Sequence, residues 1–229
     1  MEKIQFELCI KVLKKFEHAG ILPHILLAGS WSVYFYRYYF NTDSYISAIR
    51  TRDIDFVVPI PFSLKNKTDV AKLLEPLNFD VEYSGTHGLM KLQNPELTVE
   101  FLVPEKGRGS EKPYKLPDLG INAAQLRYLT MLTDNTVTVK AEGLSLTLPH
   151  PAAYALHKFI IFKRRKNKEK INRDIESAKR VFMQLVNSPD RKSIGRVFKS
   201  LHEKWRKTIM ENLRSIGEDR IIDDIESNL

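Results

Sequence analysis

The hydrophobic pattern of the chain changes its period at Pro149 and Pro151. Before these prolines, apolar segments of strand length alternate with turns rich in Gly, Pro and Asn, whereas after them apolar residues recur at helical spacing. The helical part carries one apolar face over residues 171–185 and another over 197–205. The sequence therefore predicts an α+β fold, with a mixed sheet flanked by helices over residues 1–149 and an all-helical domain over residues 150–229.

Turn residues and apolar spacing mark the expected elements of the first part. We expect helices at 3–18, 31–40 and 69–77, strands at 21–28, 53–58, 79–83, 89–92 and 97–103, and a hairpin formed by 136–140 and 144–148. Loops are expected at 41–50 and 104–118, and beyond its first strands the sheet is expected to be mostly antiparallel. The period of residues 123–132 fits both a strand and a helix, and the sequence leaves these alternatives open.

Composition excludes several classes of protein. With 229 residues, of which 43% are hydrophobic and 28% charged, the chain can bury a sizeable core and general disorder is excluded. The single cysteine, Cys9, excludes a disulfide framework and a site of clustered thiolates. Because no apolar run is long enough to cross a bilayer and the start of the chain is charged, we expect a cytoplasmic protein without a membrane partner.

The positive charge of the chain lies in its last third. Of the 36 Lys and Arg and 28 Asp and Glu, residues 1–150 hold 17 of each, so the whole excess of +8 falls after residue 150. Residues 158–180 carry ten basic and three acidic residues. Such a segment either attracts phosphates or a nucleic-acid backbone, or is the solvated face of a helix.

Asp53 and Asp55 are two positions apart on an expected strand, so their side chains leave the same face. Two neighbouring carboxylates repel each other and need a cation or hydrogen-bond donors to remain ionised when they are partly buried. A divalent ion such as Mg²⁺ meets this need with oxygen ligands, and substrate phosphates usually complete its coordination. The alternative is an exposed strand face without a metal.

Two further features accompany the aspartates. Gly29 and Ser30 open a helix, whose free N–H groups and positive dipole end can bind phosphate, although Ser30 can also serve as a simple N-cap. Glu100 is flanked by apolar residues in an expected strand, so we expect it beside the same ion or beside a base such as Arg52. The aromatic run 31–40 is typical of a packed helix and, as an alternative, could stack bases.

These residues resemble the nucleotidyltransferase superfamily with the polymerase-beta-like fold, and in particular the bacterial AbiEii and MenT toxin families. The resemblance spans residues 20–180 and rests on Ala28-Gly29-Ser30, on Thr51-Arg52-Asp53-Ile54-Asp55-Phe56, on Val99-Glu100-Phe101, and on the stretch from Leu148 through Lys158 to Asp174. It implies a nucleotidyltransferase-like sheet, a toxin–antitoxin-like context and an enzyme that transfers a nucleoside monophosphate from a nucleoside triphosphate, ATP or CTP, with release of pyrophosphate.

The resemblance also implies a role for each matching residue. Asp53 and Asp55 would hold two Mg²⁺ ions, with Mn²⁺ as an alternative, and Glu100 would bind the ion next to the acceptor and take the proton of its hydroxyl. The triphosphate would contact the backbone of Gly29, Ser30 and Trp31, the Ser30 hydroxyl, Arg52, and Lys158 together with Arg164 or Arg165.

The excess charge after residue 150 favours a polyanionic acceptor over a cationic antibiotic. We therefore expect RNA, with a tRNA end as one form of it, to lie across Lys163, Arg164, Arg165, Lys166 and Lys168. The alternative is a catalytically inactive protein of the same fold that binds nucleic acid through these basic helices.

Overall fold

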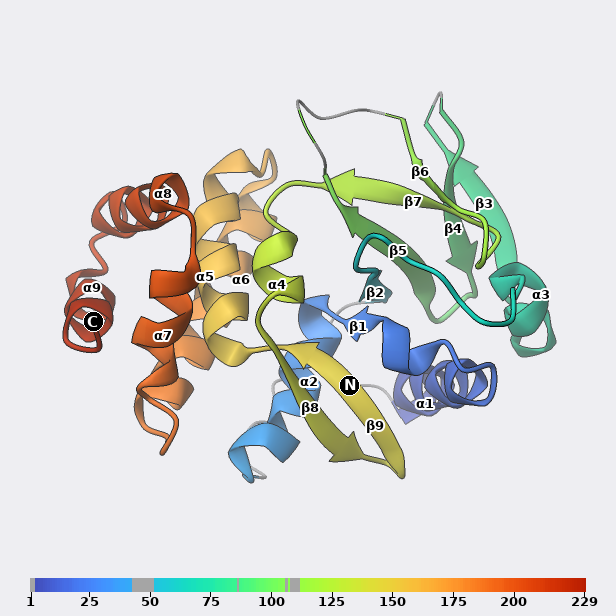
Figure 1. Ribbon diagram of the computed structural model, residues 1–229, viewed down its shortest axis with the longest axis horizontal. Helices are drawn as coiled ribbons and strands as arrows, with labels where there is room; N and C mark the ends of the chain where they lie inside the picture. The colour runs from blue at the N-terminus through green and yellow to red at the C-terminus, as the bar shows by residue number, and fades with distance from the viewer. Residues whose placement is uncertain (1–2, 43–51, 86, 106, 108–111) are drawn as a thin grey trace. The chain divides into compact units, whose positions relative to one another are not determined.

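The computed structural model describes residues 3–42, 52–85, 87–105, 107 and 112–229, so most of the expected loop at 41–50 lies outside the described residues. The chain divides into two compact units, one made of residues up to 133 with 137–148, and the other made of residues 134–136 with 149–229 (Figure 1). The expected α+β class is confirmed, because a mixed sheet fills the first unit and helices fill the second.

A seven-stranded sheet forms the centre of the first unit. Its strands are β1 (Leu26–Leu27), β2 (Asp53–Val57), β3 (Asp80–Ser84), β4 (Leu89–Gln93), β5 (Thr98–Pro104), β6 (Tyr114–Leu116) and β7 (Ile121–Leu126). The order is β1-β2-β5-β4-β3, with β7 paired to β5 and β6 paired to β7. The β2–β5 and β5–β7 pairs are parallel and the others are antiparallel, so β1 and β2, the first strands, are themselves antiparallel.

Alternation along the strands gives the sheet one apolar and one polar face. Ile54 and Phe56 of β2 and Val99 and Phe101 of β5 are buried, and Phe16 of α1 (Lys3–His18) packs its ring 5.1 Å from that of Phe56. The opposite side, which carries Asp53 and Asp55 of β2, Thr98 and Glu100 of β5, Lys91 of β4 and Glu82 of β3, is called the polar face below. Burial of the apolar face fixes the register, because a slip of one residue would exchange the two faces.

Elsewhere in the first unit, the structure corrects two expectations and decides an open one. The loop expected at 104–118, part of which lies outside the described residues, contains the strand β6. The strand expected at 21–28 is only Leu26–Leu27, because residues Leu22–His24, which include Pro23, form a 3-10 helix. Residues 123–132 contain both alternatives, since β7 ends at Leu126 and α4 (Thr130–Thr133) follows. The other helices are α2 (Gly29–Phe40) and α3 (Val70–Leu74), with a 3-10 helix at Glu75–Leu77, and β8 (Thr136–Ala141) pairs with β9 (Leu144–Pro149) in a separate sheet.

The second unit is built around α5 (Pro151–Ile161), which is buried along most of its length. It packs against α6 (Lys168–Val186), α7 (Ser193–Ser200) and α8 (Glu203–Arg214), and α9 (Asp219–Glu226) packs against α7 and α8. The rings of Phe159 on α5 and Phe182 on α6 lie 6.3 Å apart in this core. Of the helices in the described ranges, none combines the length and the apolar composition of a membrane span.

Candidate functional site

The aspartates lie on β2 as the alternation predicts. Ile54, between them, is fully buried, while Asp53 is exposed and Asp55 is partly exposed on the polar face. The backbone carbonyl of Asp55 accepts a hydrogen bond of 2.8 Å from the amide of Ala28, just before α2. This bond ties the strand that carries the carboxylates to the start of α2.

Gly29 is required at this junction for two reasons. Its φ of 63° lies in the left-handed region that residues with a Cβ rarely adopt. A Cβ on Gly29 would also overlap the Asp55 carboxylate, lying 3.2 Å from its Cγ with the Oδ2 oxygen nearer still. The absence of a side chain therefore lets the Asp55 carboxylate approach the first turn of α2.

The N-cap of α2 is not Ser30, which the sequence analysis considered as a simple N-cap. Ala28 occupies the cap position and has no capping side chain, while Ser30 lies inside the first turn and is exposed. A serine N-cap is therefore wrong at this position. The start of a twelve-residue helix, with its positive dipole end, is left beside the Asp55 carboxylate without a side-chain cap.

Glu100 is paired with a base that the sequence analysis missed. Lys91 Nζ lies 2.6 Å from Glu100 Oε1, and both side chains remain partly exposed. This hydrogen bond is the main cause of a raised pKa of Lys91, which its partial burial opposes. We expected Glu100 beside the metal ion or beside a base such as Arg52; the structure confirms a base, but that base is Lys91 of the neighbouring antiparallel strand.

Strand register aligns these charges into a row across the polar face. Asp55 is opposite Glu100 in the β2–β5 pair, Glu100 is opposite Lys91 in β5–β4, and Lys91 is opposite Glu82 in β4–β3. We call Asp55, Glu100, Lys91 and Glu82 the charged row. Arg52, which precedes β2 and is exposed, joins the same pairing through its carbonyl, which accepts a bond of 2.8 Å from the amide of Thr98. Thr51 lies outside the described residues.

The donor set on the polar face suits a hard divalent cation. Carboxylate oxygens are the ligands that Mg²⁺ takes from proteins, usually one or two of them, with water and phosphate completing the shell. Asp53 and Asp55 offer two such groups on one face. Among the described residues, no three acidic, histidine or cysteine side chains converge as a ready ligand set, and the Glu100 carboxylate is held by Lys91. The two aspartates therefore fit an ion, while Glu100 is held by Lys91 through its Oε1 oxygen.

The second unit contains a separate cluster of charges centred on Asp174. Its carboxylate accepts bonds from Lys158 Nζ at 2.6 Å and from Arg165 Nε at 2.9 Å. Lys158 and Asp174 are largely buried, whereas Arg165 is 41% exposed. The sequence left Arg164 and Arg165 as alternatives beside Lys158, and the structure brings Arg165 to the carboxylate shared with Lys158, while Arg164 is exposed.

The three charges of this cluster support one another's ionisation. Burial acts to lower the pKa of Lys158, but the neighbouring Tyr154 and Asp174 outweigh it, so the pKa is raised. Burial acts to raise the pKa of Asp174, but Lys158 and Arg165 outweigh it, so the pKa is lowered. Lys158 Nζ also lies 5.7 Å from the centre of the Tyr154 ring. The pair of Lys158 and Asp174 thus favours the charged form of each partner, and Arg165 is the most exposed member of the cluster.

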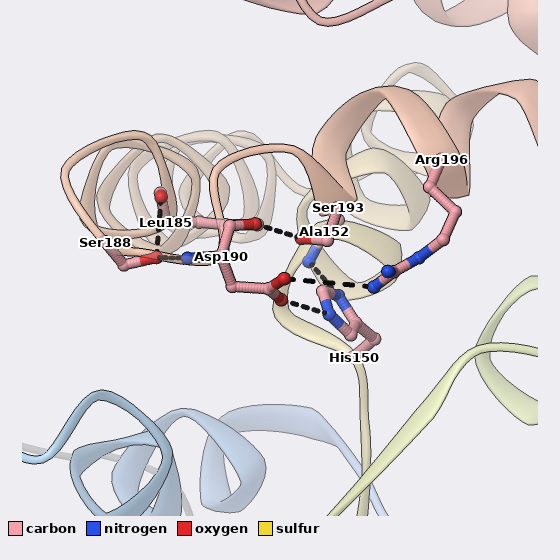
Figure 2. A network of polar contacts seen from close by, with 7 residues as sticks. All are labelled: His150, Ala152, Leu185, Ser188, Asp190, Ser193 and Arg196. Atoms are coloured by element: carbon pink, nitrogen blue, oxygen red, sulfur yellow. Dashed lines mark hydrogen bonds and ion pairs between the residues drawn. The ribbon is translucent and has the colours of Figure 1, made fainter.

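A polar network fixes the start of α5, the helix that carries Lys158. Figure 2 shows His150 at the N-cap, where its Nδ1 accepts a bond of 3.1 Å from the amide of Ala152 and its Nε2 lies 3.1 Å from Asp190 Oδ2. The Asp190 carbonyl in turn accepts a bond of 2.7 Å from Ser193 Oγ. Burial is the main cause of a lowered pKa of His150, which Asp190 opposes and Arg196 reinforces.

Three rings of the aromatic run on α2 are buried in the first unit. Trp31, Phe35 and Tyr36 are fully buried, which confirms the packed-helix interpretation for these three rings. Tyr38 is partly exposed and donates a hydrogen bond of 2.9 Å to Glu142. Burial and this bond raise the pKa of Tyr38 to about 12.

Comparison with known proteins gives one family match and several similar folds. A family described as Nucleotidyltransferase matches residues 7–201. The antibiotic-resistance factor ANT(2'')-Ia, solved in solution, is 12% identical with a TM-score of 0.52, over 96% of this chain and 98% of that one. An antigenic nucleotidyltransferase-like protein from Paracoccidioides brasiliensis is 14% identical with a TM-score of 0.54, over 99% and 93% of the two chains. These two likenesses show the fold alone, and no curated protein matches the sequence.

Proposed function

The chain belongs to the nucleotidyltransferase family, and we propose that it transfers a nucleoside monophosphate from ATP or CTP to an acceptor hydroxyl in a Mg²⁺-dependent reaction. The observation that carries this proposal is the approach of the Asp55 carboxylate to the first turn of α2 at Gly29. A carboxylate pair that suits a divalent ion thus lies beside a helix start that suits phosphate. A triphosphate chelated by Mg²⁺ presents both of the groups that such a site would bind.

In the proposed reaction, the residues of the candidate site in the first unit have separate roles. Asp53 and Asp55 would hold the ions, which would supply positive charge against the charge that develops on the reacting phosphate. The amides and the hydroxyl of Gly29 and Ser30 bind the phosphates, and the exposed Arg52 adds a positive charge near the aspartates. The acceptor oxygen bonds to the α-phosphorus, the bond from that phosphorus to pyrophosphate breaks, and Glu100 accepts the hydroxyl proton.

The cluster around Asp174 supports a role for the second unit in phosphate binding. Lys158 is neutralised in part by Asp174, so the exposed Arg165 guanidinium is the group that can meet a phosphate directly. Asp174 then positions both cations, and Lys158 contributes charge from a buried position. These contacts favour Arg165 over Arg164 as the proposed phosphate contact, with Lys158 behind it.

We further propose RNA as the acceptor, with a tRNA end as one form of it. Lys163, Arg164, Lys166 and Lys168 are all exposed and follow one another at the end of α5 and the start of α6. Such a run attracts a polyanion and disfavours a cationic antibiotic. We also propose, from the resemblance of the sequence, that the chain is related to the AbiEii and MenT toxin families.

Transfer of label tests the proposal. The protein is incubated with each α-phosphate-labelled nucleoside triphosphate, Mg²⁺ and either total RNA, a protein mixture or an aminoglycoside. We expect label in RNA, dependent on Mg²⁺ and lost in Asp55→Asn, which keeps the shape of the side chain without its charge. Label in the aminoglycoside or in protein would retain the transferase and change the acceptor. Absence of label from all three, with RNA still bound in a salt-sensitive way, would replace catalysis with the binding function.

A further inference from the structure

We propose that Lys91 is the resident counter-ion of Glu100 and that this lysine gives up the carboxylate when a divalent ion binds at Asp53 and Asp55. Lys91 is thereby a positioning residue, since it determines when Glu100 is available to the ion and to the acceptor. This inference rests on the proposed function, because it concerns the metal that this function requires.

Strand pairing determines which groups Glu100 can reach. Within the charged row, Glu100 lies between Asp55 on β2 and Lys91 on β4, each directly opposite it in the register. Adjacent strands are about 4.8 Å apart, so both neighbours are within reach of one glutamate side chain. At present its Oε1 is 2.6 Å from Lys91 Nζ. Rotation about the side-chain bonds of Glu100 moves its carboxylate from the β4 side toward the β2 side, where the aspartates lie.

The charges of the row explain why a lysine is needed there when no metal is bound. Lys91 is the one base of the charged row, and it lies opposite Glu82 as well as Glu100. Without it, carboxylates on β2, β5 and β3 would share the polar face with no positive charge within the row, and like charges on paired strands are destabilising. A divalent ion at the aspartates supplies the same compensation, so the lysine and the ion compete for Glu100.

The ion pair is exposed enough to be exchanged. The Lys91 side chain is 30% exposed and the Glu100 side chain is 21% exposed, so water reaches both groups. Ion pairs with such access are weak compared with the coordination of a carboxylate to a divalent metal. Exchange therefore requires no change in the sheet, only a new rotamer of Glu100.

Binding of Mn²⁺ to the metal-free protein, measured by calorimetry, tests the proposal without any turnover. Lys91→Met keeps most of the length of the side chain and removes its charge, and we expect it to bind Mn²⁺ about tenfold more tightly than the wild type. Lys91→Arg keeps the charge and is expected to behave as the wild type. In a Glu100→Gln background, Lys91→Met should change the affinity less than twofold. Lys115→Met removes a lysine from β6, outside the charged row, and serves as the matched control.

Thermal unfolding gives a second readout. Lys91→Met should unfold at a lower temperature than the wild type without metal and should gain more from added Mg²⁺. If Lys91→Met does not fold, Lys91→Gln replaces it in both measurements. Equal Mn²⁺ affinity in wild type and Lys91→Met, or equal tightening with and without Glu100, would overturn the role of Lys91 while leaving the proposed function intact. Failure of the proposed function gives a different result, in which wild type and Asp55→Asn both lack affinity for Mn²⁺.

Discussion

The contact between Gly29 and Asp55 sets the geometry of the candidate site at the scale of single residues. The glycine combines a left-handed backbone with a position where the neighbouring carboxylate occupies the space of a Cβ. Either feature alone would favour glycine. Together they make both the stability of the fold and the geometry of the site depend on the absence of a side chain at Gly29.

Gly29→Ala should reduce both stability and nucleotide binding. The positive φ costs about 1 kcal/mol for a residue with a Cβ, and displacement of the Asp55 carboxylate adds to this cost. Urea unfolding measures the first effect, and calorimetric titration with a nucleoside triphosphate and Mg²⁺ measures the second. Gly20→Ala is the matched control, because Gly20 has a φ of 68° but nothing within 4 Å of its Cβ position. Equal loss of nucleotide affinity in the two variants would argue against a site at Gly29.

At this scale, the sequence predicted where the carboxylates lie and missed what they contact. Alternation around Ile54 placed the two aspartates on one face of a strand, and the apolar surroundings of Glu100 predicted that it needs a partner; β2 and the ion pair with Lys91 confirm both predictions. The partner of Glu100 could not be predicted, because Lys91 meets it only through the β4–β5 register, which depends on packing of the whole sheet. Lys91 stands at the centre of a short apolar strand, and that position was the available signal.

Among the elements, α5 depends on a histidine for its start. His150 Nδ1 must be unprotonated to accept the Ala152 amide, so Nε2 carries the proton and faces Asp190 (Figure 2). Protonation of Nδ1 would remove the cap from the helix that carries Lys158. Burial of the ring also favours its neutral form, and it lowers the pKa of His150 below the ordinary value of 6.5.

This coupling predicts that acid destabilises the protein through His150. Because the folded state has the lower pKa, the contribution of the neutral ring is fully present above pH 6.5 and is lost as the pH falls through the folded pKa. One proton changes the free energy of unfolding by at most about 1.4 kcal/mol per pH unit. Urea unfolding from pH 8 to pH 5 measures it in wild type and in His150→Asn, which can cap the helix without titrating. We expect a smaller loss of stability in the variant, and parallel curves would contradict the assignment.

Helices and strands were predictable from the sequence where the apolar residues follow one period, that of a strand or that of a helix. The strands around residues 53–57, 80–84, 89–93 and 98–104 were expected within one or two residues. In β2, β4 and β5 the alternation follows one buried face, whereas β3 has no buried residue and was marked by the turn residues around it. The strand expected at 21–28 was wrong in extent, since apolar content alone does not separate a strand from a buried 3-10 turn. The ambiguity of residues 123–132 reflects two short elements joined without a long turn.

Across the whole molecule, positive charge is concentrated in the residues that follow residue 150. That part holds 19 Lys and Arg against 11 Asp and Glu, while the preceding 150 residues are balanced. Asp174 already pairs with Lys158 and Arg165, so the other exposed cations of this segment, Lys163, Arg164, Lys166 and Lys168, are better candidates for contacts with a nucleic-acid backbone.

Removal of these charges should weaken RNA binding and its dependence on salt. Replacing Lys163, Arg164, Lys166 and Lys168 with Gln removes four charges, and the slope of log K against log salt should fall by about 3 if all four contact phosphate. Fluorescence anisotropy with a labelled single-stranded RNA at several salt concentrations measures this slope. A control variant with Gln at Lys192, Lys204, Lys207 and Arg214 removes the same charge from exposed positions on and next to α7 and α8. Equal slopes in the two variants would show that only total charge matters.

Nucleotide affinity with and without Mg²⁺ tests the metal-dependent site most directly. Calorimetric titration of the full chain with ATP and with CTP measures the affinity with and without Mg²⁺. We expect the affinity to be at least tenfold lower without Mg²⁺, because the metal links the carboxylates to the phosphates. The double variant Asp53→Asn, Asp55→Asn should lose this difference while its circular dichroism and unfolding midpoint show that it is folded. Equal affinity of the wild type and the double variant for the Mg²⁺-bound nucleotide would contradict the assignment of the site to Asp53 and Asp55.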